Sequence, residues 1–374
     1  MPNRPKSPVL SEIMVFPGSS ITWAGASPLE HDLCFGTEEG QIWFADLGRV
    51  AGPLTSDSRV SGSTMPGFTI TEEAVNGVAF TPDLMAVSTR SEITFARWTA
   101  GPPAQFHLNG EYAGGAHGVI ATPGGVLAAP LGPDGLLLVE PTGAGAYSRR
   151  RLRAEGIEIS FYRIAHLGVD RGGRDVYAAA GRDAGAMEVV IDAGGGPGEI
   201  TASSDPRHPL DVVDVCSLPS VSHPFASASL GIDNAIYLSR GIVGDRAPVC
   251  LRFADLRGTA YSIASAAGHL FLLTSEALYT FPDLVSGYLD GDRLHRRRGV
   301  SRISVDPIDM ALVYGSHVLL TLDEGIAKFE IDQLVMRGGG PSWADFEALD
   351  MIPDVEDVPW ATAGGSPLEL VAVG

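Results

Sequence analysis

The sequence feature that most restricts the possible folds is an apolar hairpin pattern that recurs seven times. Each copy has a short apolar stretch, a tight turn and a second stretch of alternating apolar and polar residues. The copies occupy 31–46, 83–97, 124–140, 174–192, 224–240, 269–283 and 317–332. Their second stretches start about 47 residues apart, a period typical of proteins built from one repeated supersecondary unit. Pairs such as Glu39-Gly40 and Asp134-Gly135 separate the two stretches and favour tight hairpin turns.

Flanking segments extend the hairpins to four strands. Apolar runs that predict a first strand precede six hairpins, at 73–80, 116–122, 161–167, 211–218, 259–265 and 308–314. More polar runs that predict an outer strand lie at 104–108, 146–152, 248–253 and 300–305. Four antiparallel strands in about 40–50 residues is the size of one propeller blade. We therefore predict an all-β fold over 11–337, a seven-bladed β-propeller of four-stranded antiparallel blades. Helical periodicity is weak, apart from a short turn expected within 342–349.

The two chain ends offer two ways to close such a ring. Segment 11–16 precedes the first-blade strand at 21–25 much as 248–253 precedes 259–265. The N-terminal strand would then be the outer strand of the seventh blade, and its pairing would protect blade edges that otherwise promote aggregation. The competing prediction uses 368–373 for the same purpose.

The repeat resembles the seven-bladed propellers of the WD40 and YVTN type over roughly 11–332, and it looks like a divergent bacterial propeller. The resemblance is architectural. The Trp-Asp pair that ends a WD40 repeat is replaced here, for example by Ala45-Asp46 and Arg97-Trp98, and Gly268-His269 alone matches the Gly-His pair. A fold of this kind supports many functions, so the resemblance does not specify a chemistry.

Charge and cysteine content restrict the partners and the compartment. Acidic residues number 45 and basic residues 26, a net charge of −19, which argues against nucleic acid or anionic lipid as the main partner. Residues 1–12 lack the apolar core of a secretion signal, and no apolar run reaches the roughly 20 residues of a membrane span. Cys34, Cys216 and Cys250 lie within apolar runs, where free buried thiols are expected. We expect a cytoplasmic protein.

The resemblance implies that the first strands line a central channel whose entry loops form the usual binding face. Aligning the first strands produces a predicted ring of seven polar residues: Asn76, His117, Tyr162, Arg163, Asp214, Tyr261 and Asp309. Such a ring suits a small polar ligand. For catalysis the candidates are His117 as general base, Arg163 or Asn76 to stabilise an oxyanion, and Tyr162 and Asp309 beside them. The alternative is a water-filled channel that tolerates polar side chains.

No motif predicts a metal or a cofactor. The nine histidines are scattered, and no Cys-x-x-Cys, His-x-x-x-His or Asp-x-Asp-x-Asp-Gly pattern occurs. We therefore expect neither a metal site nor a cofactor.

Two basic clusters and an acidic tail are candidates for binding a protein partner. Arg149, Arg150 and Arg151 lie on the predicted outer strand of the third blade, and Arg296, Arg297 and Arg298 lie in a long loop of the sixth. Either cluster suits an acidic partner, or it keeps an outer edge solvated. The extension at 338–374 places Trp343, Phe346 and Trp360 among acidic residues. It either packs on its own propeller or becomes ordered on a partner.

Two hypotheses for the function follow. The first is a non-enzymatic scaffold or accessory subunit that presents propeller faces to protein partners. The second is a small-molecule enzyme, a lyase, hydrolase or cyclase, with its site at the channel mouth.

Overall fold

The computed structural model divides the chain into two compact units. The first comprises Met1–Ala74, Ala254–Ala260 and Ala264–Ile352, and the second comprises Val75–Phe253, Tyr261–Ile263 and Pro353–Gly374. The structure describes residues 12–15, 20–28, 33–45, 68–99, 105–143, 145–154, 159–182, 185–192, 198–202, 211–218, 220, 222–241, 249–252, 256–290, 300–304, 307–322, 325–335, 346–349, 354–357 and 368–373.

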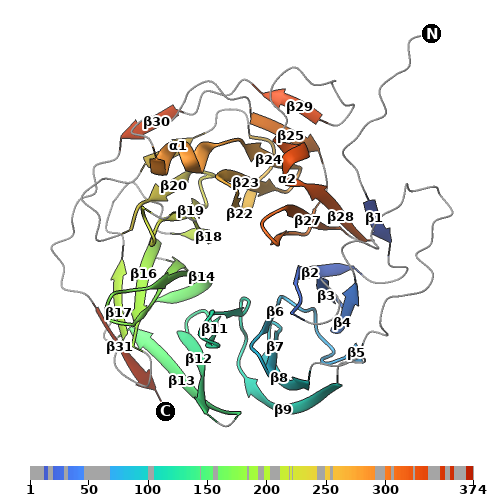
Figure 1. Cartoon of the computed structure of the whole chain (residues 1–374), viewed down its shortest axis with the longest axis vertical. Coiled ribbons are helices and arrows are strands. Elements are labelled where there is room, and N and C mark those ends of the chain that lie inside the picture. The colour runs from blue at the N-terminus through green and yellow to red at the C-terminus, as the bar shows by residue number, and fades with distance from the viewer. Residues whose placement is uncertain are drawn as a thin grey trace. The chain divides into compact units, whose positions relative to one another are not determined.

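The first unit contains three antiparallel sheets (Figure 1). In spatial order, the first sheet is β1 (Glu12–Val15), β28 (Gly325–Glu330), β27 (His317–Leu322) and β26 (Asp309–Val313). The second is β2 (Ile21–Ala26), β3 (Leu33–Thr37), β4 (Gln41–Ala45) and β5 (Phe68–Thr69). The third is β22 (Ala260–Ala266, of which Tyr261–Ile263 belong to the second unit), β23 (His269–Thr274), β24 (Ala277–Phe281), β25 (Val300–Ser304) and β29 (Phe346–Leu349). Two short helices, α1 (Leu284–Asp290) and α2 (Ile331–Leu334), follow β24 and β28.

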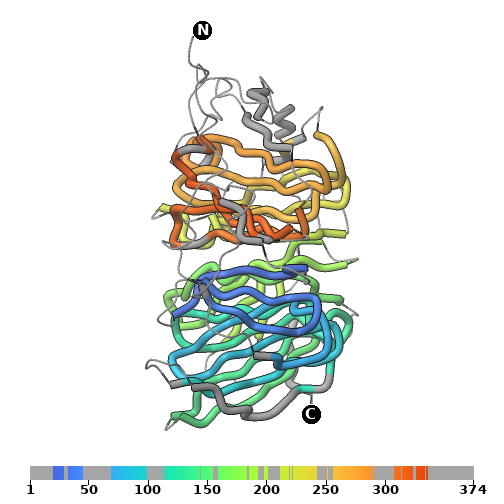
Figure 2. The backbone as a smooth tube through the Cα atoms, turned by 90° about the vertical axis from the view of Figure 1, so that its right-hand side faces the viewer, coloured from blue at the N-terminus to red at the C-terminus, as the bar shows by residue number. Residues whose placement is uncertain are grey.

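The second unit continues the same pattern. One sheet is β6 (Gly77–Phe80), β7 (Leu84–Ser88), β8 (Glu92–Thr99) and β9 (Gln105–Ala113). Next come β10 (Ile120–Ala121), β11 (Leu127–Pro130), β12 (Leu136–Gly143) and β13 (Ala146–Ala154). They are followed by β14 (Ser160–Val169), β15 (Asp175–Arg182), β16 (Gly185–Ile191) and β17 (Gly198–Ala202). The last sheet is β18 (Val212–Ser217), β19 (Ser227–Gly231), β20 (Ile236–Ser239), β21 (Val249–Arg252) and β30 (Asp354–Asp357). Tight reversals of the backbone connect many of the strands that pair with the next strand in the sequence (Figure 2).

The apolar hairpin stretches of the sequence are strands that are buried on both faces. In β12, Leu136 and Leu138 pack into a cluster with residues of β15 and β16, whereas Leu137 and Val139 pack into a cluster with residues of β7 and β8. Side chains alternate between the faces of a strand, so a strand between two packed neighbours must be apolar at every position. Each fully buried leucine contributes about 2–3 kcal/mol.

Glycine is required at one of the predicted turns. Gly135, between β11 and β12, has a φ of +96°. A Cβ atom at this position would lie 2.1 Å from the backbone carbonyl oxygen of Leu152 on β13. The Asp-Gly pair therefore allows both the positive φ and the close approach of the next strand.

Three details differ from the sequence predictions. Helix α1 begins at Leu284, where the sequence predicts no helix, and 346–349 is strand β29 and not a helical turn. Strand β1 pairs with β28, as predicted for the N-terminal strand, with Glu12 opposite Lys328 and Val15 opposite Gly325. The competing use of 368–373 at this edge is wrong, because that segment pairs with other strands.

The acidic tail adds strands to the outer edges of its own sheets. Strand β29 pairs with β25, and β30 pairs with β21. Strand β31 (Leu368–Val373) pairs with both β13 and β17, and it joins two four-stranded sheets into one of nine strands (Figure 1). Of the two predicted alternatives, the structure shows packing on the chain itself. Trp343 and Trp360 lie outside the described residues, as do Arg296, Arg297 and Arg298.

Candidate functional site

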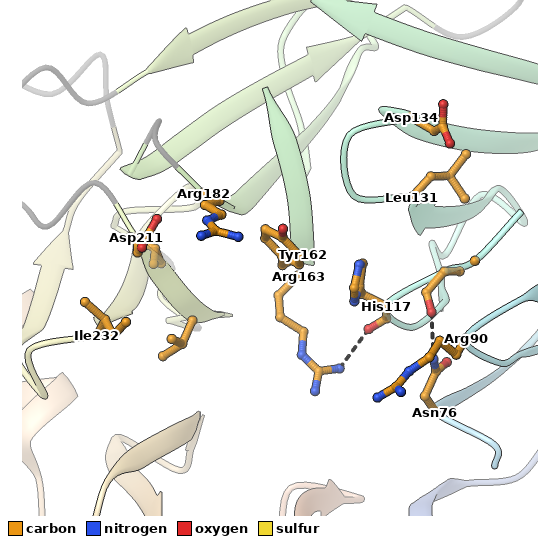
Figure 3. Close-up of a pocket in the computed structure, with 14 residues that line it drawn as sticks. Asn76, Arg90, His117, Leu131, Asp134, Tyr162, Arg163, Arg182, Asp211 and Ile232 are labelled. Carbon is orange, nitrogen blue, oxygen red and sulfur yellow. Dashed lines mark hydrogen bonds between the residues drawn. The ribbon is translucent and has the colours of Figure 1, made fainter. Parts of the chain in front are cut away.

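A polar pocket of about 800 Å³ lies within the second unit (Figure 3). Its walls come from residues within or just before strands β6, β10, β14 and β18 and from the turns beside them. The polar lining residues are Asn76, Arg90, His117, Asp134, Tyr162, Arg163, Arg182 and Asp211. The structure thus brings together four residues of the predicted ring, namely Asn76, His117, Tyr162 and Arg163.

Backbone and amide hydrogen bonds hold His117 in place. The Asn76 side chain donates from Nδ2 to the carbonyl oxygen of Ala116 (2.6 Å) and accepts at Oδ1 from the hydroxyl of Ser88 (2.6 Å). The His117 amide donates to the carbonyl oxygen of Pro130 (2.9 Å). Asn76 therefore positions the segment that carries His117, and its own polar atoms are already engaged.

A β-bulge in β14 directs two consecutive side chains to the pocket. Phe161 pairs with Gly181 and Arg163 with Ala180, so Tyr162 is the extra residue of the bulge. Consecutive residues of a regular strand face opposite ways, and a bulge changes this alternation. As a result, the Tyr162 ring packs edge-on against the His117 ring, with centroids 4.6 Å apart, while Arg163 Nη1 donates to the carbonyl oxygen of His117 (3.1 Å) (Figure 3).

The environment of His117 favours its neutral form. Burial lowers the pKa of this imidazole below its usual value, and the positive charges of Arg163 and then Arg90 lower it further. At neutral pH the ring can therefore accept a proton or a hydrogen bond.

The pocket contains cationic groups that the described residues do not neutralise. The exposed Arg90 makes no side-chain hydrogen bond or ion pair with the residues that the structure describes, and in the same residues Arg163 bonds only to the His117 carbonyl. Asp134, at another wall, is paired with Arg153 of β13 and lies 3.9 Å from Arg151. An oxyanion thus has two guanidinium groups available.

The other residues of the predicted ring lie elsewhere. Asp214 is buried, and its carboxylate accepts hydrogen bonds from the amides of Val215 (2.9 Å) and Ile263 (2.8 Å), so it holds strands together and does not line the pocket. Tyr261, on β22, is also absent from the lining. Asp309 belongs to the first unit, where its carboxylate accepts from the amide of Met310 (2.8 Å).

Sequence reasoning missed four lining residues: Arg90, Asp134, Arg182 and Asp211. They lie at strand ends or in turns, outside the aligned column of first-strand residues. In the sequence, the pair Asp134-Gly135 indicates a hairpin turn, and no further pattern indicates that Asp134 lines a pocket.

The arginine cluster on β13 is only partly available to a partner. Arg150 has a side chain that is 9% exposed, and its Nη2 donates to Glu140 Oε1 (2.9 Å) and to the carbonyl oxygen of Asp192 (3.1 Å). The guanidinium of Arg149 lies 4.6 Å from the centroid of the Phe95 ring. The prediction that Arg150 faces a partner is therefore wrong, because this side chain forms a buried ion pair.

The described ranges contain free thiols and neither a metal-binding cluster nor a membrane-spanning helix. Cys34 and Cys216 are free thiols, and burial raises the pKa of Cys34 well above its usual value. Within these ranges, no three His, Cys, Asp or Glu side chains form a group that could hold a metal ion. No helix there has the length and apolar character needed to span a membrane.

Comparisons with solved structures define the class of fold. A streptogramin B lyase structure is similar with a TM-score of 0.58 and 13% identity, over 85% of this chain and 96% of that one. The WD40 β-propeller domain of Doa1 is similar with a TM-score of 0.55 and 12% identity, over 86% and 97%. No protein-family model and no curated protein matches the sequence. The chain is therefore an all-β protein that resembles propellers in fold and diverges from them in sequence.

Proposed function

We propose that this chain is a seven-bladed propeller, closed by its N-terminal strand, that serves as a non-enzymatic scaffold or accessory subunit for protein partners. The sheets of the two units supply strands for all seven predicted repeats, and the pairing of β1 with β28 supports closure. The net charge of −19 favours protein over nucleic acid or anionic membranes. Free thiols such as Cys34 support a reducing compartment, and we propose the cytoplasm.

The observation that carries the proposal is the combination of groups around the pocket. Ile232, which is 58% exposed, lines it together with Val213 and with the arginines described above. Exposed apolar side chains beside arginine are characteristic of protein interfaces, where apolar burial supplies affinity and arginine supplies directed hydrogen bonds. The similar WD40 domain is consistent with such a role at the level of the fold.

A matched pair of substitutions tests this function. Tagged protein is recovered from its native host as wild type, as Ile232→Asp and as Val169→Asp, and stoichiometric partners are compared. Val169 is 57% exposed and lies outside the pocket, so it controls for a new surface charge. We expect the partner to be lost with Ile232→Asp and retained with Val169→Asp. Absence of any stoichiometric partner, or equal recovery with all three proteins, contradicts the scaffold.

The second candidate function is a small-molecule enzyme, a lyase, hydrolase or cyclase, at the same pocket. The neutral imidazole of His117 favours it, because a neutral ring next to Tyr162 and Arg163 suits a general base with a cationic group for a developing negative charge. This alternative predicts that His117→Ala abolishes turnover while leaving Tm nearly unchanged. Retained turnover in His117→Ala would exclude it.

A further inference from the structure

We propose that the pocket binds an acidic peptide segment of the partner, with a carboxylate side chain on Arg90 and Arg163 and an apolar side chain on Val213 and Ile232. This inference rests on the proposed scaffold function and adds the chemistry of the segment that is recognised. It follows from which donors are free, from the charge of the lining and from the position of the apolar wall.

The strongest charged donors with N–H groups that the described residues leave unengaged belong to Arg90 and Arg163. A guanidinium has five N–H donors, and within the described part of the chain one of those on Arg163 is engaged, by the carbonyl of His117. Arg90 is exposed, and none of its donors is engaged by the residues that the structure describes. Asn76 is excluded as the main ligand group because its amide already bonds Ala116 and Ser88.

The charge of the lining favours a carboxylate. Three arginines and two aspartates line the pocket, and His117 is favoured in its neutral form, so the lining has a net positive formal charge. One of the aspartates, Asp134, is already paired with Arg153 outside the lining. The positive lining attracts an anion, and in a protein that already carries −19 a carboxylate with one negative charge is favoured over a phosphate group with nearly two.

The apolar wall explains why the ligand is a peptide and not a lone anion. Val212 of β18 is buried and Val213 is half-buried, and both line the pocket. Ile232, in the turn before β20, is exposed and lines the same pocket (Figure 3). A volume of about 800 Å³ is far more than one carboxylate occupies. In an extended peptide, side chains two positions apart share a face, so an acidic residue and an apolar residue at i and i+2 can use both walls.

Four blocked peptides test the proposal by NMR titration of the His117 ring signals. The test peptide is acetyl-Glu-Gly-Leu-amide. Acetyl-Gln-Gly-Leu-amide lacks the charge, acetyl-Glu-Gly-Gly-amide lacks the apolar side chain, and acetyl-phosphoserine-Gly-Leu-amide carries the phosphate. We expect the test peptide to bind about tenfold or more tightly than the Gln peptide, since charge-assisted hydrogen bonds are lost with Gln. The bound carboxylate should also raise the pKa of His117.

Variants assign the effect to the two arginines. Arg90→Gln and Arg163→Gln should each remove most of the preference for Glu over Gln, while Arg171→Gln, at an exposed turn outside the pocket, should retain it. If loss of the Arg163 hydrogen bond displaces His117, the Arg90→Gln variant still tests whether an arginine binds the carboxylate. Equal binding of the Glu and Gln peptides, tighter binding of the phosphoserine peptide, or an unchanged preference in both arginine variants overturns the proposal.

The two proposals fail in different ways. If Ile232→Asp loses the captured partner but Arg90→Gln and Arg163→Gln both retain it, the scaffold stands and the carboxylate inference is wrong. If wild-type protein captures no partner, the scaffold fails, and the peptide titration still decides whether the pocket binds a carboxylate.

Discussion

Two adjacent arginines on β13 should differ sharply in their effect on stability. Arg150 and Glu140 form an ion pair at 2.9 Å with side chains only 9% and 12% exposed, and Arg150 also donates to the carbonyl oxygen of Asp192. Arg151, the next residue, is more exposed and lies 3.9 Å from the largely exposed Asp134. Because neighbouring residues of a strand face opposite ways, one arginine points into the sheet packing and the other toward solvent.

The magnitudes follow from what each substitution leaves behind. Arg150→Ala leaves the Glu140 carboxylate buried without its partner, which costs about 3–5 kcal/mol. Arg151→Ala removes a solvent-screened pair and costs at most about 1 kcal/mol. For a protein of 374 residues, the larger loss lowers Tm by roughly 4–6 °C, which a thermal melt followed by circular dichroism resolves.

A double variant separates burial of charge from loss of packing. Arg150→Met with Glu140→Leu should recover most of the stability lost in Arg150→Ala, because well-packed apolar side chains can replace a buried ion pair. Equal destabilisation by Arg150→Ala and Arg151→Ala would refute the reasoning, since it would mean that Glu140 is not isolated in a buried site.

Three further predictions concern a turn, the pocket and the tail. Gly135→Ala should destabilise the protein far more than Gly143→Ala. The two positions have a similar positive φ, but a Cβ atom at position 143 has no atom within 4 Å, so Gly143→Ala should cost about 1 kcal/mol in denaturant unfolding. Equal costs of the two substitutions would contradict this. Arg163→Gln should raise the pKa of His117 toward its usual value without reaching it, because burial is the larger cause of the lowered pKa. NMR titration of the ring measures this pKa, and a constant or lower value would contradict the prediction. Deleting 367–374 should lower Tm and increase self-association in light scattering, because the edges of β13 and β17 lose their partner strand. An unchanged Tm and unchanged light scattering would contradict the pairing of β31.

The strand hairpins were predictable because two physical constraints coincide in the sequence. Strands such as β12 are apolar at consecutive positions since both faces are buried, and the turns between them need residues such as Gly135. The positions of the tail strands were not predictable. The apolar segment 368–373 is compatible with several unpaired edges, and only the three-dimensional arrangement selects β13 and β17.

The candidate site was predictable only where the first strands follow one pattern. In β14 and β18 the bulge residues are Tyr162 and Val213, and both line the pocket. The next residues diverge, since Arg163 lines the pocket while Asp214 turns inward to the amides of β18 and β22. Arg163 and Asp214 occupy equivalent positions when the predicted first strands are aligned with one another. The sequence does not show which backbone amides lie near each side chain.

Hydrogen–deuterium exchange on the captured complex tests the central claim, that a protein partner binds at the pocket of the second unit. Exchange is compared between free protein and the complex with the recovered partner. The account predicts slower exchange on binding in 115–118, in 160–163 and around Ile232, the segments that form the pocket walls. Protection confined to the outer strands, with these segments unchanged, would contradict it.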